Sequence, residues 1–222
     1  MSGQDHPPEL DELLELLRTD PYAPVAASTL PRAREVHIAD SLSGLEQEPI
    51  RSAGRLADLG SGAGFPGLVL AAALPTARVD LIESVSRKCE FLGRAIERMG
   101  LENATVVGAR AEGWSAGDGR EAYDVVTARA VGRLSTLAEL ASPLLRPDGT
   151  LAAWKGRRDP GEEAELGRAS ARLAMEPVEV RAVTPYAGSR DRHIHLLRKN
   201  GPTPNDLPRR DGLAAKRPFG AE

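Results

Sequence analysis

The chain has 222 residues, a formal net charge of −3, 41% hydrophobic residues and 27% charged residues, as expected for one globular domain with a real core. Its single cysteine, Cys89, excludes an intramolecular disulfide and a cysteine-based zinc site. No apolar run approaches the roughly 18 residues that span a membrane, and the acidic N-terminus lacks a basic signal region. We therefore expect a cytoplasmic protein with no membrane partner.

Apolar spacing predicts amphipathic helices at 9–17 and 34–42, separated by a proline-containing stretch. From Arg55 onward, predicted strands alternate with predicted helices. The strands are expected at 55–59, 78–83, 104–109, 123–128, 150–154, 177–183 and 193–198, and the helices at 67–74, 85–99, 134–145 and 161–174. Such alternation predicts an α/β fold whose mostly parallel sheet is covered on both faces. Only TPYAGSRDR separates the last two strands, so these should form an antiparallel hairpin.

Three segments are expected: an N-terminal helical segment at 1–54, a Rossmann-like domain at 55–199, and a basic, proline-rich extended tail at 200–222. Charge is distributed unevenly among them. Residues 1–20 contain six acidic residues and one Arg, whereas residues 181–222 contain nine Lys or Arg and four acidic residues. A basic end can supply a phosphate-binding face, although basic tails are more often simply solvated.

The segment DLGSGAGFPG, at 58–67, contains four glycines in ten residues. Glycine costs roughly 0.5–1 kcal/mol relative to alanine inside a regular element, so the cluster needs a local reason. A tight turn needs one or two glycines, and the larger number favours close approach of a ligand. The loop follows a short apolar strand and precedes an apolar helix, an arrangement that presents backbone N–H groups and a helix dipole to a nucleotide-type ligand.

Two cofactor classes fit such a loop. A dinucleotide fold requires G-x-G-x-x-G, but Phe65 stands at the third glycine position and no second glycine loop follows, which disfavours hydride chemistry. The other class is S-adenosylmethionine (SAM). Asp58 could face its amino-acid portion, and Glu83 could accept both ribose hydroxyls or cap the helix that follows. Ala111 and Glu112 come after the third strand, where the adenine edge would lie, although a lone Glu is usually just solvated.

The motifs DLGSGAGFPG, LIESVSRKCEFL, VVGARAE, YDVVTARAVG, AWKG and RHIHLLRK occur in this order, with HIADSL at 37–42. With these motifs the chain, from about 36 to 199, resembles the bacterial 16S rRNA guanine-N7 methyltransferase family, also called glucose-inhibited division protein B. The resemblance implies a class I SAM-dependent methyltransferase fold with a seven-stranded sheet. It also implies methylation of a guanine N7 in the 530 loop of 16S rRNA. The cofactor contacts that it implies are Gly60, Phe65, Ala111, Glu112 and Arg129.

Together, the residues and the resemblance give one set of candidate cofactor-binding residues: Asp58, Gly60, Gly62, Gly64, Phe65, Glu83, Ala111, Glu112 and Arg129. Arg129 ends the fourth strand and is also the candidate catalytic residue. Its guanidinium could hold the guanine O6 edge, stack on the base or bind the SAM carboxylate. Because N7 carries a lone pair and no proton, alignment of the reactants is the main requirement and no general base is expected.

The candidate RNA-binding residues lie near loops that could face phosphate, or are solvated: Lys155, Arg190, Arg192, Lys199, Arg209 and Arg210. His37 and Asp40 are interpreted first as a capping or packing pair and second as RNA contacts. No metal is expected, because His193 and His195 have no third ligand at a suitable spacing. The expected partner is 16S rRNA or the 30S subunit, bound by a monomer.

Two alternatives remain at this stage. One is a SAM-dependent methyltransferase that acts on a small molecule or a protein, in which case the basic end is incidental. The other is a non-catalytic RNA- or nucleotide-binding module on the same fold.

Overall fold

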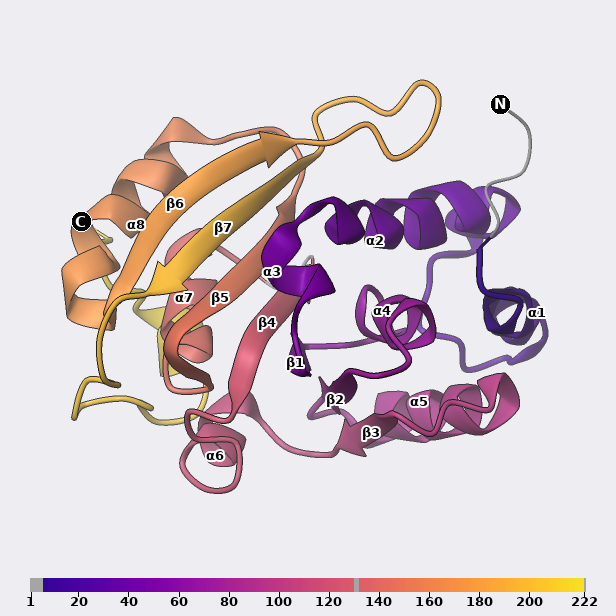
Figure 1. Cartoon of the computed structure of the whole chain (residues 1–222), viewed down its shortest axis with the longest axis horizontal. Helices are drawn as coiled ribbons and strands as arrows, with labels where there is room; N and C mark the ends of the chain where they lie inside the picture. The colour runs from indigo at the N-terminus through magenta and orange to yellow at the C-terminus, as the bar shows by residue number, and fades with distance from the viewer. Residues whose placement is uncertain (1–5, 130–131, 222) are drawn as a thin grey trace.

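The chain folds around one seven-stranded sheet in the order β3-β2-β1-β4-β5-β7-β6 (Figure 1). The computed structural model describes residues 6–129 and 132–221. Strands β1 to β5 pair in parallel, and β7 is antiparallel to β5 and β6, so the predicted C-terminal hairpin is confirmed. The strands are β1 (Arg55–Leu59), β2 (Arg78–Ile82), β3 (Ala104–Val107), β4 (Tyr123–Arg129), β5 (Leu145–Lys155), β6 (Met175–Ala182) and β7 (His193–Lys199).

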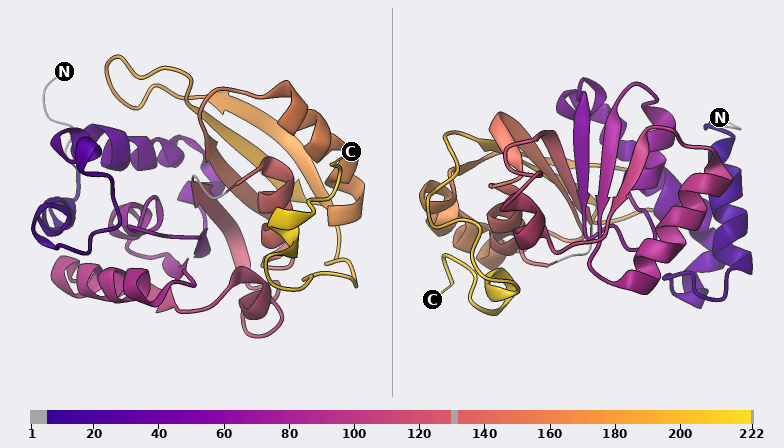
Figure 2. Two further views of the ribbon diagram at one scale, coloured as in Figure 1. Left: turned by 180° about the vertical axis from the view of Figure 1, so that it is seen from behind. Right: turned by 90° about the horizontal axis from the view of Figure 1, so that it is seen from below.

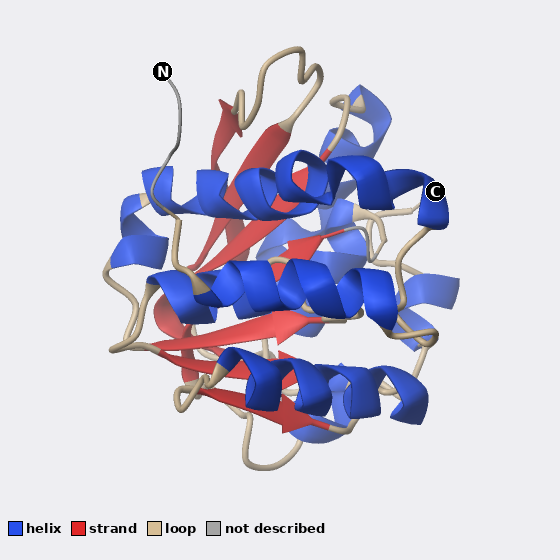
Figure 3. Cartoon of the chain, turned by 90° about the vertical axis from the view of Figure 1, so that its right-hand side faces the viewer, coloured by secondary structure: helices blue, strands red, loops and turns tan. Residues whose placement is uncertain are grey.

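Helices cover both faces of this sheet, and Figure 3 shows one layer lying across the strands. The α-helices are α1 (Glu9–Thr19), α2 (Asp40–Leu42), α3 (Glu48–Arg51), α4 (Gly67–Ala73), α5 (Ser86–Met99), α6 (Ala111–Ser115), α7 (Leu134–Ala141), α8 (Pro160–Leu173) and α9 (Leu213–Lys216). Helix α1 packs on α4 and α5, whereas α7 and α8 pack together beside β5 and β6. No helix in the described part of the chain is both long and apolar enough to cross a membrane.

Two hydrophobic cores lie on opposite faces of the sheet. Along β1, Leu56 packs in the core that contains Phe91 of α5, whereas Ala57 packs in the core that contains Leu137 of α7. Successive side chains of a strand point to opposite faces. Both faces are buried here, which explains why these strands appear in the sequence as short apolar runs rather than as alternating patterns.

Two predicted boundaries are wrong by several residues. Helix α7 ends at Ala141 rather than at 145, and β5 begins at Leu145 rather than at 150. Residues 147–149 of β5 are Pro-Asp-Gly, a sequence typical of a turn. Leu145 nevertheless pairs with Tyr123 of β4, and the register shifts between Tyr123 and Val125 to accommodate the extra residues of β5. A β-bulge allows a strand to continue through a sequence that would otherwise predict a turn.

The N-terminal segment is helical where the sequence predicts it. Residues 34–42 are continuously helical, with the wider turns of a π-helix in η2 (Arg34–Ala39) followed by α2. Two shorter 3₁₀ elements, η1 (Ala27–Arg32) and η3 (Ser43–Glu46), flank this stretch. Residues 1–5 of the segment, Ala130 and Val131 of the YDVVTARAVG motif, and Glu222 lie outside the described residues.

The C-terminal segment is not the extended tail that its composition predicts. It runs back across the domain, as the yellow trace in both views of Figure 2 shows, and it includes the short helix α9. Leu207 and Ala214 are buried, and Arg209 pairs with Glu139 of α7. The sequence does not indicate that Leu207 and Ala214 are buried, because each stands alone among charged residues and prolines and gives no periodic pattern.

Candidate active site

The glycine loop occupies the turn between β1 and α4. Gly60, Gly62 and Gly64 have φ angles of 68°, 57° and 89°, a region that other residues rarely adopt. Gly67 is needed for a different reason, because a Cβ there would clash with Leu81 and with the Asp58 side chain. Backbone conformation and close packing therefore account for the glycines of the loop.

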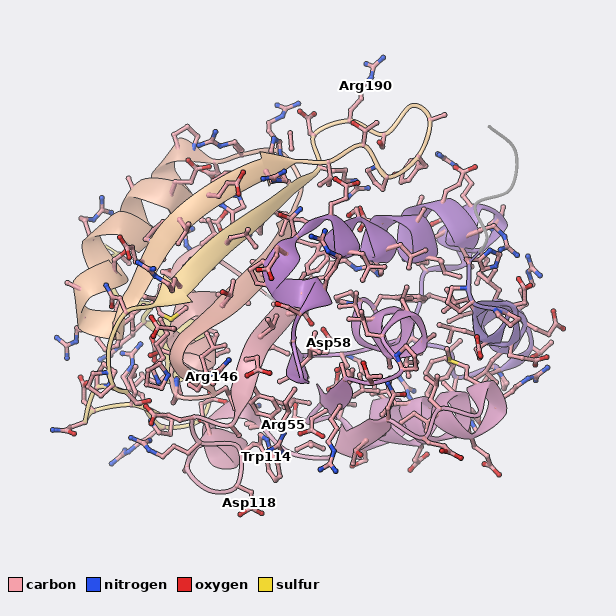
Figure 4. All side chains as sticks on the ribbon, in the orientation of Figure 1. Arg55, Asp58, Trp114, Asp118, Arg146 and Arg190 are labelled. Carbon is pink, nitrogen blue, oxygen red and sulfur yellow. The ribbon has the colours of Figure 1, made fainter. Side chains whose placement is uncertain are left out.

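Asp58 supports the loop from within the protein. Its carboxylate accepts hydrogen bonds from the Gly67 N–H at 3.2 Å and from the Thr127 hydroxyl at 2.9 Å. Burial raises the pKa of Asp58 to about 6, and the hydrogen bonds from Thr127, Ser61 and Gly67 oppose this shift. Figure 4 labels Asp58 beside β1. Both oxygens are used inside the fold, so the predicted contact with the amino-acid portion of a cofactor is not supported.

Glu83 follows β2 and connects the glycine loop to the start of α5. One carboxylate oxygen accepts from the Gly62 N–H at 3.1 Å, and the other accepts from the N–H groups of Ser84 and Val85 at 2.8 and 2.9 Å. Glu83 also lines a cavity at this edge of the sheet. Glu83 therefore ties the glycine loop to the residues that lead into α5, and its contact with a ligand stays a prediction.

This cavity, of about 200 Å³, lies at the carboxyl ends of β1, β2 and β3 and is called the β1–β3 cavity. It brings together four predicted residues and two unpredicted ones: Gly60, Glu83, Ala111, Glu112, Gly212 and Ala214. Clefts at this edge of an open α/β sheet are where nucleoside ligands bind. Among the predicted cofactor residues, Gly62 and Gly64 shape the loop without lining the cavity.

The C-terminal segment supplies one wall of the β1–β3 cavity. The Gly212 N–H donates to a Glu112 carboxylate oxygen at 2.7 Å, across 100 residues of sequence. The Thr136 hydroxyl of α7 donates to the Ala214 carbonyl at 3.2 Å. Sequence reasoning missed this wall, because nothing local in a proline-rich, charged segment indicates which distant carboxylate its backbone will meet.

A second cavity, of about 190 Å³, lies at the carboxyl ends of β4 and β5 and is called the β4–β5 cavity. Its lining includes Asp40, Arg129, Trp154, Lys155, Arg192 and His193. Strand β4 is the neighbour of β1 in the sheet, so the two cavities open on adjacent stretches of one edge. Such an arrangement can hold two reactants, one on each side of the β1–β4 boundary.

Arg129 lies at this boundary and is largely buried. One guanidinium nitrogen donates to an Asp40 carboxylate oxygen at 3.0 Å, and the guanidinium carbon lies 5.1 Å from the centre of the Phe65 ring. His37 stacks on the same Phe65 ring, with the ring centres 4.8 Å apart, and its Nδ1 atom lies 3.4 Å from the Arg129 guanidinium. Phe65, His37 and Arg129 thus contact one another in one cluster, whereas Phe65 is expected to be a wall of the cofactor pocket.

His37 and Asp40 do act as packing residues, and both contact Arg129. His37 contacts Phe65, and Asp40 pairs with Arg129. Trp154 of β5 holds the backbone at Asp40, because its indole N–H donates to the Asp40 carbonyl at 2.9 Å. The HIADSL segment is therefore attached directly to the glycine loop and to β4.

Titration of His37 provides a test of this packing. Burial, followed by the nearby positive charge of Arg129, lowers the pKa of His37 to about 4. The folded protein favours the neutral ring. The free energy of unfolding therefore keeps its full value above about pH 6.5, and it decreases as the pH falls toward 4 because protonation of His37 favours the unfolded chain. We expect NMR of the imidazole to give a midpoint near 4, with His37→Asn used to assign the signal. A midpoint near 6.5 would contradict the buried stacking.

The predicted RNA-binding residues divide into three groups. Arg190 and Arg210 are exposed, and Figure 4 shows Arg190 pointing away from the body at the tip of the loop before β7. Arg192 and Lys155 line the β4–β5 cavity. The Lys155 ammonium also donates to Glu162 at 2.7 Å and to the Gly132 carbonyl at 2.9 Å.

Lys199 and Arg209 do not belong to an exposed basic face. The Lys199 side chain is 0% exposed, and its ammonium donates to Glu121, the Leu145 carbonyl and Thr203. Arg209 pairs with the buried Glu139 carboxylate. Lys199 is neutralised inside the fold, so its predicted contact with RNA phosphate is wrong, and the pairing of Arg209 with Glu139 disfavours such a contact there.

Within residues 6–129 and 132–221, no three His, Cys, Asp or Glu side chains gather in a way that could hold a metal ion.

The sheet order, the glycine loop after β1 and the acidic residue after β2 define a class I SAM-dependent methyltransferase fold. A SAM-dependent methyltransferase from Aquifex aeolicus has a similar structure, with a TM-score of 0.55, 18% identity and coverage of 76% of this chain and 93% of that one. Fibrillarin of Methanococcus jannaschii, a pre-rRNA processing protein, gives a TM-score of 0.56 with 20% identity over 73% of this chain and 74% of that one.

The model of the rRNA small subunit methyltransferase G family, GidB, matches residues 22–195, and the chain belongs to this family. A relative named ribosomal RNA small subunit methyltransferase G, from Rubrobacter xylanophilus, is 43% identical over 82% of this chain and 72% of its own length. One of the same name from Thermotoga neapolitana is 40% identical over 93% of this chain and 88% of its own length.

Proposed function

We propose that the protein transfers a methyl group from SAM to N7 of a guanine in the 530 loop of 16S rRNA. The supporting observation is the pair of cavities on one sheet edge, of which the β1–β3 cavity has the lining for a nucleoside and the β4–β5 cavity is lined by Arg129, Lys155 and Arg192. The names of the relatives, which specify small-subunit rRNA, supply the class of substrate.

The residues of the β1–β3 cavity fit a SAM molecule. A Glu83 carboxylate oxygen can accept from ribose hydroxyls, the Gly60 backbone allows close approach, and Ala111 with Glu112 lies where an adenine edge would be read. Arg129 is within reach of the boundary and can hold the carboxylate of the cofactor or orient the acceptor base. When bound, SAM supplies an electrophilic methyl carbon and retains the electron pair of its broken carbon–sulfur bond.

The protein contributes alignment and charge balance. Guanine N7 has an in-plane lone pair and no proton, so the chain does not need a base there. Alkylation makes the guanine ring cationic, and an uncompensated arginine beside it would oppose the reaction. The Asp40 carboxylate, bonded to Arg129 at 3.0 Å, offsets that charge. Groups placed in advance around developing charge stabilise the transition state without reorganising.

The exposed or partly exposed cations Lys155, Arg190, Arg192 and Arg210 would contact rRNA phosphates, which makes binding dependent on salt. They lie at the ends of β5 and β7 and in the C-terminal segment. We propose that the protein acts in the cytoplasm as a monomer, on the 30S subunit or on its 16S rRNA.

The decisive experiment uses methyl-labelled SAM and 30S subunits that lack the modification. Borohydride–aniline treatment cuts RNA at N7-methylguanine, so we expect label in 16S rRNA and cleavage at one guanine of the 530 loop. Label without cleavage would refute N7 as the acceptor. Label that survives RNase would instead favour a protein substrate. No label from a protein that binds SAM would favour a small-molecule acceptor.

A further inference from the structure

Asp40 lies at the edge of the β4–β5 cavity and has one carboxylate oxygen that accepts no hydrogen bond from the residues that the structure describes. The residue is 3% exposed, and its Oδ2 atom pairs with Arg129, but its Oδ1 atom is buried and meets no hydrogen-bond donor within residues 6–129 and 132–221. The nearest cation on that side is Arg192, whose Nε atom lies 4.0 Å from Oδ1, too far for a hydrogen bond. A buried, unsatisfied polar atom in a native protein requires an explanation.

The surroundings of Asp40 are rigid on one side and movable on the other. Its backbone carbonyl is held by the Trp154 indole at 2.9 Å, and its Oδ2 atom is held by Arg129. The Arg192 side chain is 37% exposed, and its hydrogen bond to the Tyr186 hydroxyl is long at 3.4 Å. Displacement of Arg192 toward solvent would therefore open the Oδ1 atom to a ligand without disturbing the rest of the carboxylate.

Guanine offers the donors that this oxygen lacks. Its N1–H and 2-amino groups lie on one edge, whereas N7 and O6 on the other edge are acceptors. A carboxylate oxygen accepts from N1–H or from the 2-amino group and rejects adenine, which has no proton at N1. The displaced Arg192 remains a donor for O6 or for the phosphate of the same nucleotide.

We propose that Asp40 binds the acceptor guanine by accepting a hydrogen bond at Oδ1 from its 2-amino group. This inference rests on the proposed function and assigns the β4–β5 cavity as the base-binding site. The contact also serves the reaction, because alkylation at N7 draws electron density from the ring and makes the N1–H and 2-amino protons more acidic. The hydrogen bond to the carboxylate becomes stronger in the transition state than in the ground state, which is the condition for catalysis. No proton leaves the base in this step.

The test removes one donor from the RNA and one acceptor from the protein. The RNA is 16S rRNA ligated from two fragments, with the target guanine replaced by inosine, which lacks the 2-amino group, and assembled into 30S subunits. Single-turnover methylation rates are divided by the rates of dimethyl sulfate alkylation of the same RNAs, which corrects for the intrinsic reactivity of N7. For the unaltered protein we expect guanine to react about tenfold or more faster than inosine, as for a hydrogen bond to a charged group.

Asp40→Asn keeps the size of the side chain and an oxygen for Arg129, but it turns an amide donor toward the donors of guanine. We expect the rate with guanine to fall at least about 100-fold and the guanine-to-inosine ratio to fall toward one, while the calorimetric affinity for SAM is retained. The matched control is Asp80→Asn, because Asp80 also pairs with an arginine, Arg55, at 3.0 Å. This variant should keep the ratio of the unaltered protein.

The outcomes separate the inference from the proposed function. A ratio near one for the unaltered protein would overturn the inference even if Asp40→Asn fails to fold, because that measurement needs no variant. A wild-type ratio in Asp40→Asn would also overturn it, since a purely structural role would slow both substrates equally. Failure of the unaltered protein to methylate guanine-containing 30S subunits would overturn the proposed function, and the inference with it.

Discussion

Replacement of Gly62 by valine should weaken SAM binding by roughly 100-fold or more while the protein stays folded, because a β-branched residue strains a left-handed backbone by about 1–3 kcal/mol. Gly62 has a φ of 57°, and its N–H donates to Glu83. A chain that relaxes to negative φ would therefore move both the loop and the carboxylate expected to hold the ribose. Isothermal calorimetry gives the affinity, and thermal unfolding checks the fold.

The matched control is Gly100→Val. Gly100 has a similar φ of 63°, at the end of α5, and a Cβ there would meet no atom within 4 Å. Gly62 is also uncrowded, with its nearest neighbour 3.8 Å from the added Cβ, so both variants carry the same kind of backbone strain. Unchanged SAM affinity in Gly62→Val, or an equal loss in Gly100→Val, would contradict a specific role for the loop.

Replacement of Lys199 by alanine should lower the free energy of unfolding by about 3 kcal/mol, since removing one partner from a buried ion pair typically costs about 3–5 kcal/mol. All three donors of the ammonium are used, and it carries no exposed surface. Chemical denaturation at neutral pH measures the loss. The adjacent Arg198→Ala is the control, because Arg198 pairs with Glu176 at the surface and should contribute at most about 1 kcal/mol.

The loss at Lys199 should also depend on pH. Hydrogen bonds from Lys199 and then from Thr203 lower the pKa of Glu121 from 4.5 to about 2. A carboxylate whose pKa is lower in the folded state stabilises the protein above its unfolded pKa, and this contribution is lost as the pH falls. The difference between Lys199→Ala and the unaltered protein should therefore shrink from pH 4.5 toward pH 2. A difference that stays constant over this range would contradict the coupling.

The sheet and the cofactor edge could be predicted from the sequence because their signals are local. Seven apolar runs, a glycine loop after the first and an acidic residue after the second all lie within short windows. In a parallel sheet the carboxyl ends of neighbouring strands meet, so residues following β1, β2 and β3 converge in one cavity. This reasoning needs no knowledge of individual side-chain contacts.

Contacts between distant segments could not be predicted in the same way. Asp40 meets Arg129 across 89 residues, and the burial of Lys199 depends on Glu121, which lies in a turn 78 residues earlier. A lysine in a basic stretch predicts a solvated cation on composition alone. Tertiary packing determines which carboxylate neutralises the lysine, and this packing produces no periodic pattern in the sequence.

The wall that Gly212 and Ala214 add to the β1–β3 cavity has a consequence for the order of biosynthesis. Both residues follow β7, the last strand, so they emerge from the ribosome after every strand of the sheet. Domains fold as the chain emerges, and here the scaffold precedes the completed binding site. A nascent chain with a finished sheet therefore has an open nucleoside site, which closes only when residues beyond β7 have emerged and reached Glu112 and Thr136.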